Sequence, residues 1–258
     1  MSNNKRDFFS EFLWMIITIV VFLFLLVIWN FPLSAQTIVK KYDGVHKIRI
    51  DGSHPDHLGK GYVFFCGGGF VVQNWGVCNK WEAMAVADGD VSFRVGYSTS
   101  FLYPTLSAVN RGVDDCATAL QMIQMICKQY GVHPDSIYLC GTSAGGIVAM
   151  QLAYSKGYDV AGILNGWGAI LNINDLQNNN VPVLNIGTVT DKTVPPDCGQ
   201  SFGVNVCGQN AIYQRMLLMG IPTDQWMIDG YKHGMEPKDM EYNWRIENCF
   251  NLFKKFIK

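Results

Sequence analysis

The sequence has little charge and no long run of either sign. Only 16% of its 258 residues are charged, and 20 basic residues nearly balance 21 acidic ones. Proteins that bind nucleic acid or an anionic lipid surface usually carry a basic patch, so this balance argues against both kinds of partner. We therefore expect the partner to be a small or neutral molecule.

Metal-binding signatures are missing as well. The eight cysteines include no C-x-x-C pair, and no histidine stands at the spacing of a zinc finger. No internal repeat or long low-complexity segment divides the chain. Nearly half of the residues are hydrophobic, which is enough to bury one sizeable core in a chain of this length. We expect one globular domain without a metal site.

The N-terminal 35 residues differ from the rest. Lys5 and Arg6 precede a long apolar stretch over residues 12–29, and the small-residue sequence LSAQ follows at 33–36. This order is typical of a secretory signal peptide cleaved after Ala35. An uncleaved membrane anchor is the alternative, because the stretch approaches the ~18 apolar residues that span a bilayer. In either case we expect residues 36–258 to form the folded domain in an exported location, periplasmic or secreted.

An exported location permits disulfides. Cys198 and Cys207 share one loop rich in glycine and proline, and we predict a disulfide between them. Cys66 with Cys78 is the second candidate pair. Three further cysteines lie in apolar-patterned segments and are expected to be small buried side chains: Cys116, Cys127 and Cys140.

From residue 45 onward, short β-rich runs alternate with helical stretches. The expected strands are HKIRI, YVFFC, VSFRVGY, SIYLC, VAGILN, VPVLNI and DQWMI, and the expected helices cover residues 113–130, 144–156, about 208–219 and about 240 to the end. This alternation predicts the α/β class, with a mostly parallel central sheet and helices on both faces. The stretch 166–180 is too short for an extra domain, so we expect a minimal lid.

The segment SIYLCGTSAGG places G-T-S-A-G between an expected strand and an expected helix. This is the context of a nucleophile elbow, in which a sharp turn exposes the serine hydroxyl at the carboxyl edge of the sheet. Gly141 and Gly145 allow neighbouring backbone to approach, and the following helix N-terminus supplies partial positive charge. We predict Ser143 as the nucleophile, with a chance match in a glycine-rich loop as the alternative.

The strand YVFFC runs directly into the glycine run GGGF at residues 67–70. Acyl transfer needs backbone N–H donors aimed at the developing oxyanion, and losing one such donor typically slows the reaction ~100-fold or more. We predict that N–H groups around Gly68, Gly69 and Ala144 form this oxyanion hole. A flexible turn is the alternative interpretation of the glycines.

Asp191 follows the expected strand VPVLNI, and His233 follows the next one, DQWMI. A neutral imidazole can take the proton of a serine hydroxyl, and a buried carboxylate holds that imidazole in the required tautomer. Side chains at the carboxyl edge of a parallel sheet can meet there despite their separation in sequence. We predict His233 as the general base and Asp191 as the acid, with Asp197 open as the alternative acid.

Together these residues resemble the α/β-hydrolase superfamily, and within it the carboxylesterase branch of hormone-sensitive-lipase-like enzymes and small polysaccharide acyl esterases. GGGF is similar to the family's oxyanion motif HGGG, GVHPDSIYLCGTSAGG to its elbow region, and DKTVP and HG to its acid and base segments. The resemblance extends from about residue 45 to the end. It departs at Cys66, where the family has a histidine, and by one additional residue between Gly187 and Asp191.

The resemblance implies ester hydrolysis through an acyl-serine intermediate, without metal or organic cofactor. The short segment after the VAGILN strand predicts an open site for a short acyl group on a larger alcohol, and family analogy suggests a carbohydrate ester. Phe70, Trp75 and Trp167 are the candidate lining residues. The alternatives are a serine peptidase, a lipase anchored to a membrane by residues 12–29, and a catalytically silent binding protein.

Overall fold

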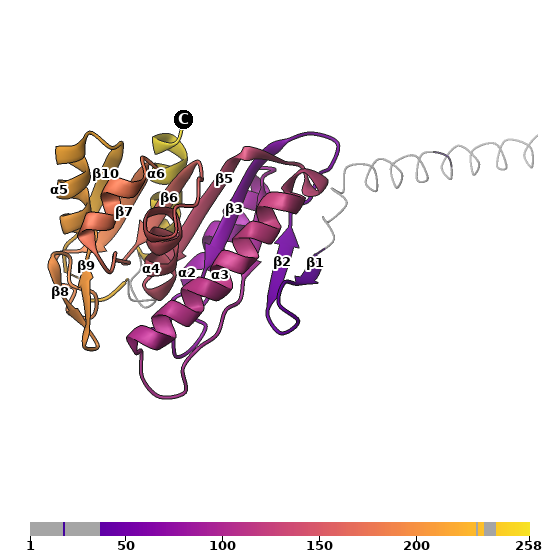
Figure 1. The fold of residues 1–258 in the computed structure, drawn as a ribbon. Coiled ribbons are helices and arrows are strands. Elements are labelled where there is room, and N and C mark those ends of the chain that lie inside the picture. The colour runs from indigo at the N-terminus through magenta and orange to yellow at the C-terminus, as the bar shows by residue number, and fades with distance from the viewer. Residues whose placement is uncertain (1–17, 19–36, 231, 235–240) are drawn as a thin grey trace, which may run out of the picture. The chain divides into compact units, whose positions relative to one another are not determined.

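A central sheet of eight strands runs through the computed structural model (Figure 1). The structure describes residue 18 and residues 37–230, 232–234 and 241–258. The strands of the sheet are β1 (Ile38–Lys41), β2 (Lys47–Asp51), β3 (Gly59–Phe65), β4 (Val91–Val95), β5 (Val132–Thr142), β6 (Gly162–Gly166), β7 (Val183–Thr188) and β10 (Thr223–Ile228).

The strand order is β1-β2-β4-β3-β5-β6-β7-β10. The pairs β1–β2 and β2–β4 are antiparallel, whereas all the pairs from β4 to β10 are parallel. All seven predicted strands are present, and the predicted α/β class with a mostly parallel sheet is confirmed. Parallel strands end at the same edge, so the loops that follow β3, β5, β7 and β10 are brought together there.

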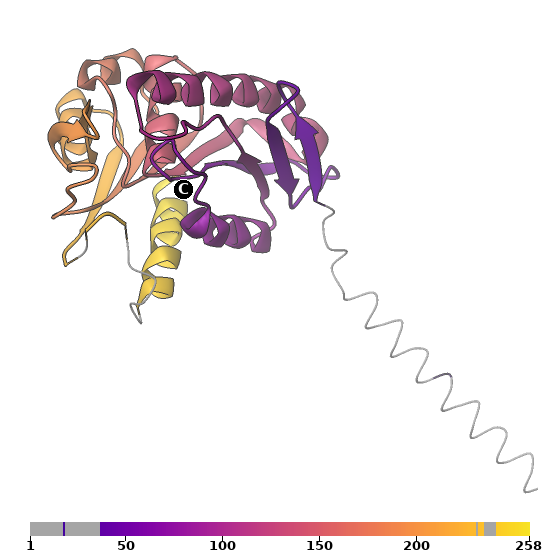
Figure 2. The same cartoon turned by 90° about the horizontal axis from the view of Figure 1, so that it is seen from below.

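Helices cover both faces of this sheet. On one face lie α2 (Gly76–Ala87) and α6 (Tyr242–Phe256), and on the other lie α3 (Leu106–Ile126), α4 (Ala144–Met150) and α5 (Gln209–Met219). Figure 2 shows α3 and the pair α2 and α6 on opposite sides of the strands. The predicted arrangement of helices on both faces is therefore confirmed.

The two-sided burial explains why the central strands are continuous apolar runs. In β3, Tyr62 and Phe64 pack toward α2 and α6, whereas Val63 and Phe65 pack into the core on the α3 and α4 side. All four side chains are completely buried. Because alternate residues of a strand point to opposite faces, a strand covered on both sides needs an apolar residue at every position.

Several element boundaries differ from the sequence-based expectation. Helix α3 begins seven residues earlier than predicted, because Thr105 caps it by accepting a hydrogen bond from the Ala108 amide. Helix α4 ends at Met150 and continues as a π-helical turn over Gln151–Ser155. Helix α2 and strand β1 were not predicted, because α2 has no side-chain cap at its start and has Asp88, not a glycine, as its C-cap, and β1 is a short edge strand.

An unpredicted hairpin lies between β7 and α5. Its strands, β8 (Cys198–Ser201) and β9 (Val204–Cys207), are antiparallel and are joined by a disulfide between Cys198 and Cys207. This confirms the predicted pair. Cys66 and Cys78 are both free, so the second candidate pair is wrong. The three cysteines that were expected to be buried and unpaired are indeed buried and free: Cys116, Cys127 and Cys140.

Residues 1–17 and 19–36, which contain the predicted signal peptide or anchor, lie outside the described residues. Within the part of the chain that the structure describes, no helix combines the length and the apolar character needed to cross a membrane. The prediction for the N-terminal segment thus stays a prediction.

Candidate active site

Three side chains from separate loops meet at the carboxyl edge of the sheet. Ser143 follows β5, Asp191 follows β7, and His233 follows β10. Nε2 of His233 lies 2.8 Å from Oγ of Ser143, and Nδ1 lies 2.7 Å from Oδ2 of Asp191. Because an ionised carboxylate only accepts hydrogen bonds, Nδ1 carries the proton, and Nε2 is left to accept from the serine hydroxyl.

The carboxylate of Asp191 is held in place by the backbone. Its side chain is fully buried, and its Oδ1 accepts hydrogen bonds from the amides of Thr193, at 2.8 Å, and Val194, at 3.0 Å. Asp197, the alternative acid, is exposed and accepts instead from Nδ2 of Asn210 at 2.6 Å. The structure therefore brings Asp191, and not Asp197, to His233.

Ser143 sits on a strained turn between β5 and α4. Its φ of 53° and ψ of −118° are unusual for a residue with a side chain, and such strain is typical of a nucleophile elbow. A Cβ at Gly141 would lie 2.1 Å from the Gly145 carbonyl oxygen, and one at Gly145 would lie 2.0 Å from the Phe65 carbonyl oxygen. Neither position has room for a side chain, as the G-x-S-x-G spacing predicted.

The glycine run forms a loop beside Ser143. Gly67 and Asn74 exchange backbone hydrogen bonds of 3.1 and 2.9 Å, which close the loop. Gly68 has a φ of 116°, and a Cβ there would lie 2.1 Å from the Val72 carbonyl oxygen, so only glycine fits. Within the described residues, the amides of Gly68 and Gly69 have no hydrogen-bond acceptor.

Ala144 is the first residue of α4, so its amide belongs to the helix turn whose N–H groups lack intrahelical partners. Gly67, at the start of the glycine run, lies close to the elbow, because a Cβ built on it would be 3.4 Å from Cβ of Ser143. The three amides predicted to form an oxyanion hole therefore lie on the glycine loop beside the serine and at the start of α4 directly after it. Their role in binding an oxyanion stays a prediction.

Tyr97 and Cys78 brace the glycine loop, which has Cys66 where the similar family has a histidine. The hydroxyl of Tyr97 donates a 2.7 Å hydrogen bond to the Cys66 carbonyl, and the Cys78 thiol donates to the Phe65 carbonyl at 3.4 Å. Burial raises the pKa of both the Cys66 and Cys78 thiols to about 12. These thiols are therefore protonated structural groups and not nucleophiles.

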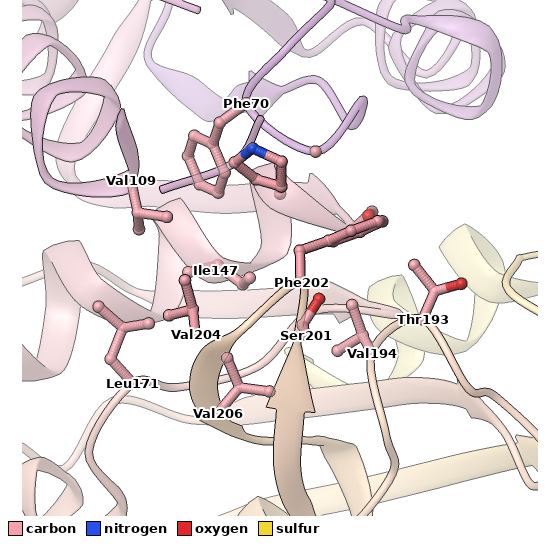
Figure 3. Close-up of a pocket in the computed structure, with 14 residues that line it drawn as sticks. Phe70, Val109, Ile147, Leu171, Thr193, Val194, Ser201, Phe202, Val204 and Val206 are labelled. Atoms are coloured by element: carbon pink, nitrogen blue, oxygen red, sulfur yellow. The ribbon is translucent and has the colours of Figure 1, made fainter. Parts of the chain in front are cut away.

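Two cavities meet at Ser143. The smaller has a volume of about 30 Å³ and a mostly apolar lining, which includes Phe70, Val109, Ile147, Leu171, Val204 and Val206 (Figure 3). The larger has a volume of about 700 Å³ and is lined by residues that include Val71, Asn74, Val77, Trp167, His233 and Tyr242.

The larger cavity opens to the surface between exposed side chains. Leu102 and Tyr103 border it and are 68% and 71% exposed. Phe202, at the tip of the β8–β9 hairpin, lines both cavities together with Thr193. The site is thus divided into a small apolar side and a large side accessible from solvent.

Two of the three predicted lining residues reach these cavities. Phe70 lines the small one, and Trp167 lines the large one while its Nε1 donates to Oγ1 of Thr188 at 2.8 Å. Trp75, at the start of α2, lines neither cavity. Its ring centre lies instead 4.6 Å from the guanidinium carbon of Arg94. Sequence reasoning missed the hairpin residues, although a V-x-V alternation before Cys207 marks a strand there.

One group of potential metal ligands occurs among the described residues. The ligand atoms of Asp43, His46 and Asp115 all lie within 4.8 Å of one another. Nδ1 of His46 already lies within hydrogen-bond distance of Oδ2 of Asp43, and none of the three lines either cavity at Ser143. This group has no part in the arrangement around the serine.

Comparisons with known proteins agree with this architecture. A family model described as the α/β hydrolase fold matches residues 62–169. No curated protein matches the sequence. Two solved structures of an esterase from Thermogutta terrifontis, described as propionate-bound and butyrate-bound, each cover 87% of this chain and 94% of their own, at 19% and 18% identity and TM-scores of 0.65 and 0.66.

A third solved structure, MGS-M1, is described as an α/β hydrolase enzyme from a Medee basin deep-sea metagenome library. It is 16% identical, with a TM-score of 0.66, and the match covers 87% of this chain and 98% of that one. Identities this low establish a shared fold. Together with the family model, they confirm the predicted resemblance to α/β hydrolases.

Proposed function

We propose that this chain, which has the α/β-hydrolase fold, is a serine esterase that hydrolyses short-chain carboxylic esters. One observation carries the proposal: Ser143, His233 and Asp191 form a continuous hydrogen-bonded chain with links of 2.8 and 2.7 Å. A serine hydroxyl is a poor nucleophile by itself and needs such a base, oriented by a third group, to attack a carbonyl.

In the proposed reaction, Oγ of Ser143 attacks the ester carbonyl carbon while its proton passes to Nε2 of His233. The buried carboxylate of Asp191 stabilises the imidazolium that forms. The amides of Gly68, Gly69 and Ala144 bind the oxyanion. The ester C–O bond breaks as the imidazolium protonates the departing alcohol, which leaves an acyl-serine. Water, deprotonated by the same imidazole, attacks the acyl carbon. The bond to Oγ of Ser143 then breaks as the imidazolium returns a proton to Oγ, and the carboxylic acid leaves.

The two cavities support a short acyl group and a larger alcohol. A volume of about 30 Å³ holds two or three water-sized groups, since one water needs roughly 10–15 Å³ by this measure. The carbonyl carbon is bonded to Ser143, so only the carbons beyond it occupy this space. Two or three such carbons correspond to an acyl chain of up to about four carbons. The similar esterase structures described as propionate-bound and butyrate-bound are consistent with this size. The 700 Å³ cavity suits a bulky alcohol, and a carbohydrate is the candidate that family analogy supplies.

The proposal includes an exported location, based on the basic, apolar and small-residue order of residues 1–35. The test is cell fractionation of the full chain, followed by N-terminal sequencing. A mature protein that begins at Gln36 supports a cleaved signal peptide. An intact, membrane-associated N-terminus supports the anchor, and an intact protein in the cytosol contradicts export.

The catalytic proposal is tested with nitrophenyl esters of two to ten acyl carbons and with a fluorophosphonate probe. The wild-type chain should hydrolyse acetyl to butyryl esters and label with the probe. Ser143→Ala and His233→Ala should each lose at least about 1,000-fold in kcat while keeping the wild-type fold. A folded wild type that neither hydrolyses any ester nor reacts with the probe would overturn the proposal.

A further inference from the structure

The β8–β9 hairpin forms one wall of the small cavity. Four of its residues line the space: Ser201, Phe202, Val204 and Val206. Across the cavity, Phe70 comes from the glycine loop and Ile147 from α4 (Figure 3). One wall of the cavity thus comes from a hairpin that follows Asp191 in the chain.

The strand pattern of β9 directs alternate side chains to opposite sides. Val204 and Val206 are two positions apart and both line the cavity. Asn205, between them, is exposed and its Oδ1 accepts a hydrogen bond from Nε2 of Gln200 at 3.1 Å. Because side chains alternate with a period of two along a strand, this register places a valine face on the cavity and a polar face in solvent.

The two strands of the hairpin are attached to the domain unequally. In β9, Cys207 exchanges backbone hydrogen bonds of 2.8 and 2.9 Å with Ile170. In β8, three of four residues are exposed, and Ser201 alone is buried. An isolated two-stranded hairpin is marginally stable in water, so the Cys198–Cys207 disulfide is well placed to hold β8 against β9.

The turn of the hairpin holds a strained aromatic residue at the junction of the two cavities. Phe202 and Gly203 form the two-residue turn, with φ values of 50° and 80°. This turn geometry favours Asn-Gly, so phenylalanine is a poor choice for the turn itself. Phe202 is nevertheless placed where it lines both the small and the large cavity. Strain of this kind often accompanies a functional position.

We propose that the disulfide-locked hairpin is the gauge of acyl length: Val204 and Val206 on β9 close the acyl side of the site, and the Cys198–Cys207 bond keeps Ser201 of β8 and the Phe202 turn against them. The assignment of the ligand as an acyl chain rests on the proposed function. Loss of the disulfide lets β8 and the turn move away from α4, so the cavity admits longer chains.

The first test measures binding without turnover. In a Ser143→Ala background, the affinities of acetate, propionate, butyrate, hexanoate and octanoate are measured by calorimetry. Affinity should increase up to butyrate and fall roughly tenfold or more by hexanoate, since one misfitting methylene typically changes discrimination by about 10–200-fold. Affinity that rises steadily to octanoate, or no binding of any of these carboxylates, would overturn the proposal.

The second test adds three variants to that background. Val206→Ala removes two methyl groups from the wall and should raise the hexanoate-to-acetate affinity ratio roughly tenfold. The double variant Cys198→Ser with Cys207→Ser should raise the ratio in the same direction. Asn205→Ala, on the opposite face of β9, is the matched control and should leave the ratio unchanged. Chemical reduction of the disulfide should raise the hexanoate-to-acetate affinity ratio of the Ser143→Ala protein and leave that of the double variant unchanged.

A general loss of folding lowers all affinities together, whereas movement of the wall changes their ratio. If the double variant does not fold, Val206→Ala still tests the proposal. An unchanged hexanoate-to-acetate affinity ratio in Val206→Ala would refute it. The same series with Ser143 intact, measured by nitrophenyl ester hydrolysis, separates this inference from the proposed function. The variants could change the chain-length preference in binding as expected while the protein with Ser143 intact hydrolyses no ester. That result would support the hairpin as the gauge and contradict the proposed esterase activity.

Discussion

Asp191 accepts a hydrogen bond from His233 across 2.7 Å, although 42 residues separate them in the sequence. The carboxylate is fully buried and bound by two backbone amides, whereas the imidazole is 23% exposed. A rigid, buried partner of this kind sets which ring nitrogen carries the proton, and so leaves the other nitrogen facing Ser143.

Asp191→Asn should therefore reduce kcat by roughly 10⁴-fold, because the amide favours the wrong imidazole tautomer. The measurement is steady-state hydrolysis of nitrophenyl butyrate. Asp197→Asn is the matched control and should retain nearly full activity, since Asp197 is exposed and bonded to Asn210. Equal losses in the two variants would contradict the assignment of the acid.

Gly145→Ala should inactivate the protein and destabilise it by about 1–3 kcal/mol, because its Cβ would overlap the Phe65 carbonyl oxygen at 2.0 Å. The elbow or the glycine loop must move to relieve this contact. Gly157→Ala is the control: a Cβ there meets nothing within 4 Å, and its φ of 74° adds backbone strain alone. We expect about 1 kcal/mol of destabilisation from the control with activity retained, measured by urea unfolding and ester hydrolysis.

Tyr97→Phe should lower kcat more than it changes KM, because it removes the hydroxyl that holds the Cys66 carbonyl next to the glycine loop. Leaving that buried carbonyl without its partner should also reduce the free energy of unfolding by about 1–3 kcal/mol.

Tyr62→Phe offers a matched comparison for this change. Tyr62 is equally buried, but its hydroxyl has no hydrogen-bond partner among the described residues. Its removal should leave kcat unchanged and stability the same or slightly higher. If both variants lose activity to the same extent, the Tyr97 hydroxyl does not position the loop.

Buried thiols should limit stability at alkaline pH. Burial raises the pKa of the Cys78 thiol from 9.0 to about 12. Between these pH values the unfolded chain releases the proton while the folded chain retains it. The free energy of unfolding should therefore fall as pH rises, by about 1.4 kcal/mol per pH unit for this thiol, with no contribution well below pH 9.

Urea unfolding of wild type and Cys78→Ala from pH 7.5 to 11 measures this contribution as the difference in slope above pH 9. The variant should be less stable at neutral pH because of the cavity it leaves, but it should lose stability less steeply. Parallel slopes would show that Cys78 does not contribute to the pH dependence.

Much of the fold follows from local rules that can be applied to the sequence alone. Strands such as YVFFC are recognisable because burial on both faces demands an apolar residue at every position. The elbow is equally local: Gly141, Ser143 and Gly145 act within one turn, and the structure shows that a Cβ at either glycine would collide with backbone. The disulfide was predictable because both cysteines lie in one short loop.

The remaining features depend on contacts between segments that are distant in sequence. The sequence left Asp191 and Asp197 as alternatives, and the path of the loop after β7 brings Asp191 to His233. The bracing of the glycine loop by Tyr97 joins positions 31 residues apart, which no motif reveals. The role of Val204 and Val206 as a cavity wall depends on where the hairpin folds. Backbone and burial preferences depend on neighbouring residues and can therefore be predicted from the sequence. Cavity walls and hydrogen-bond partners depend on how distant segments pack across the sheet.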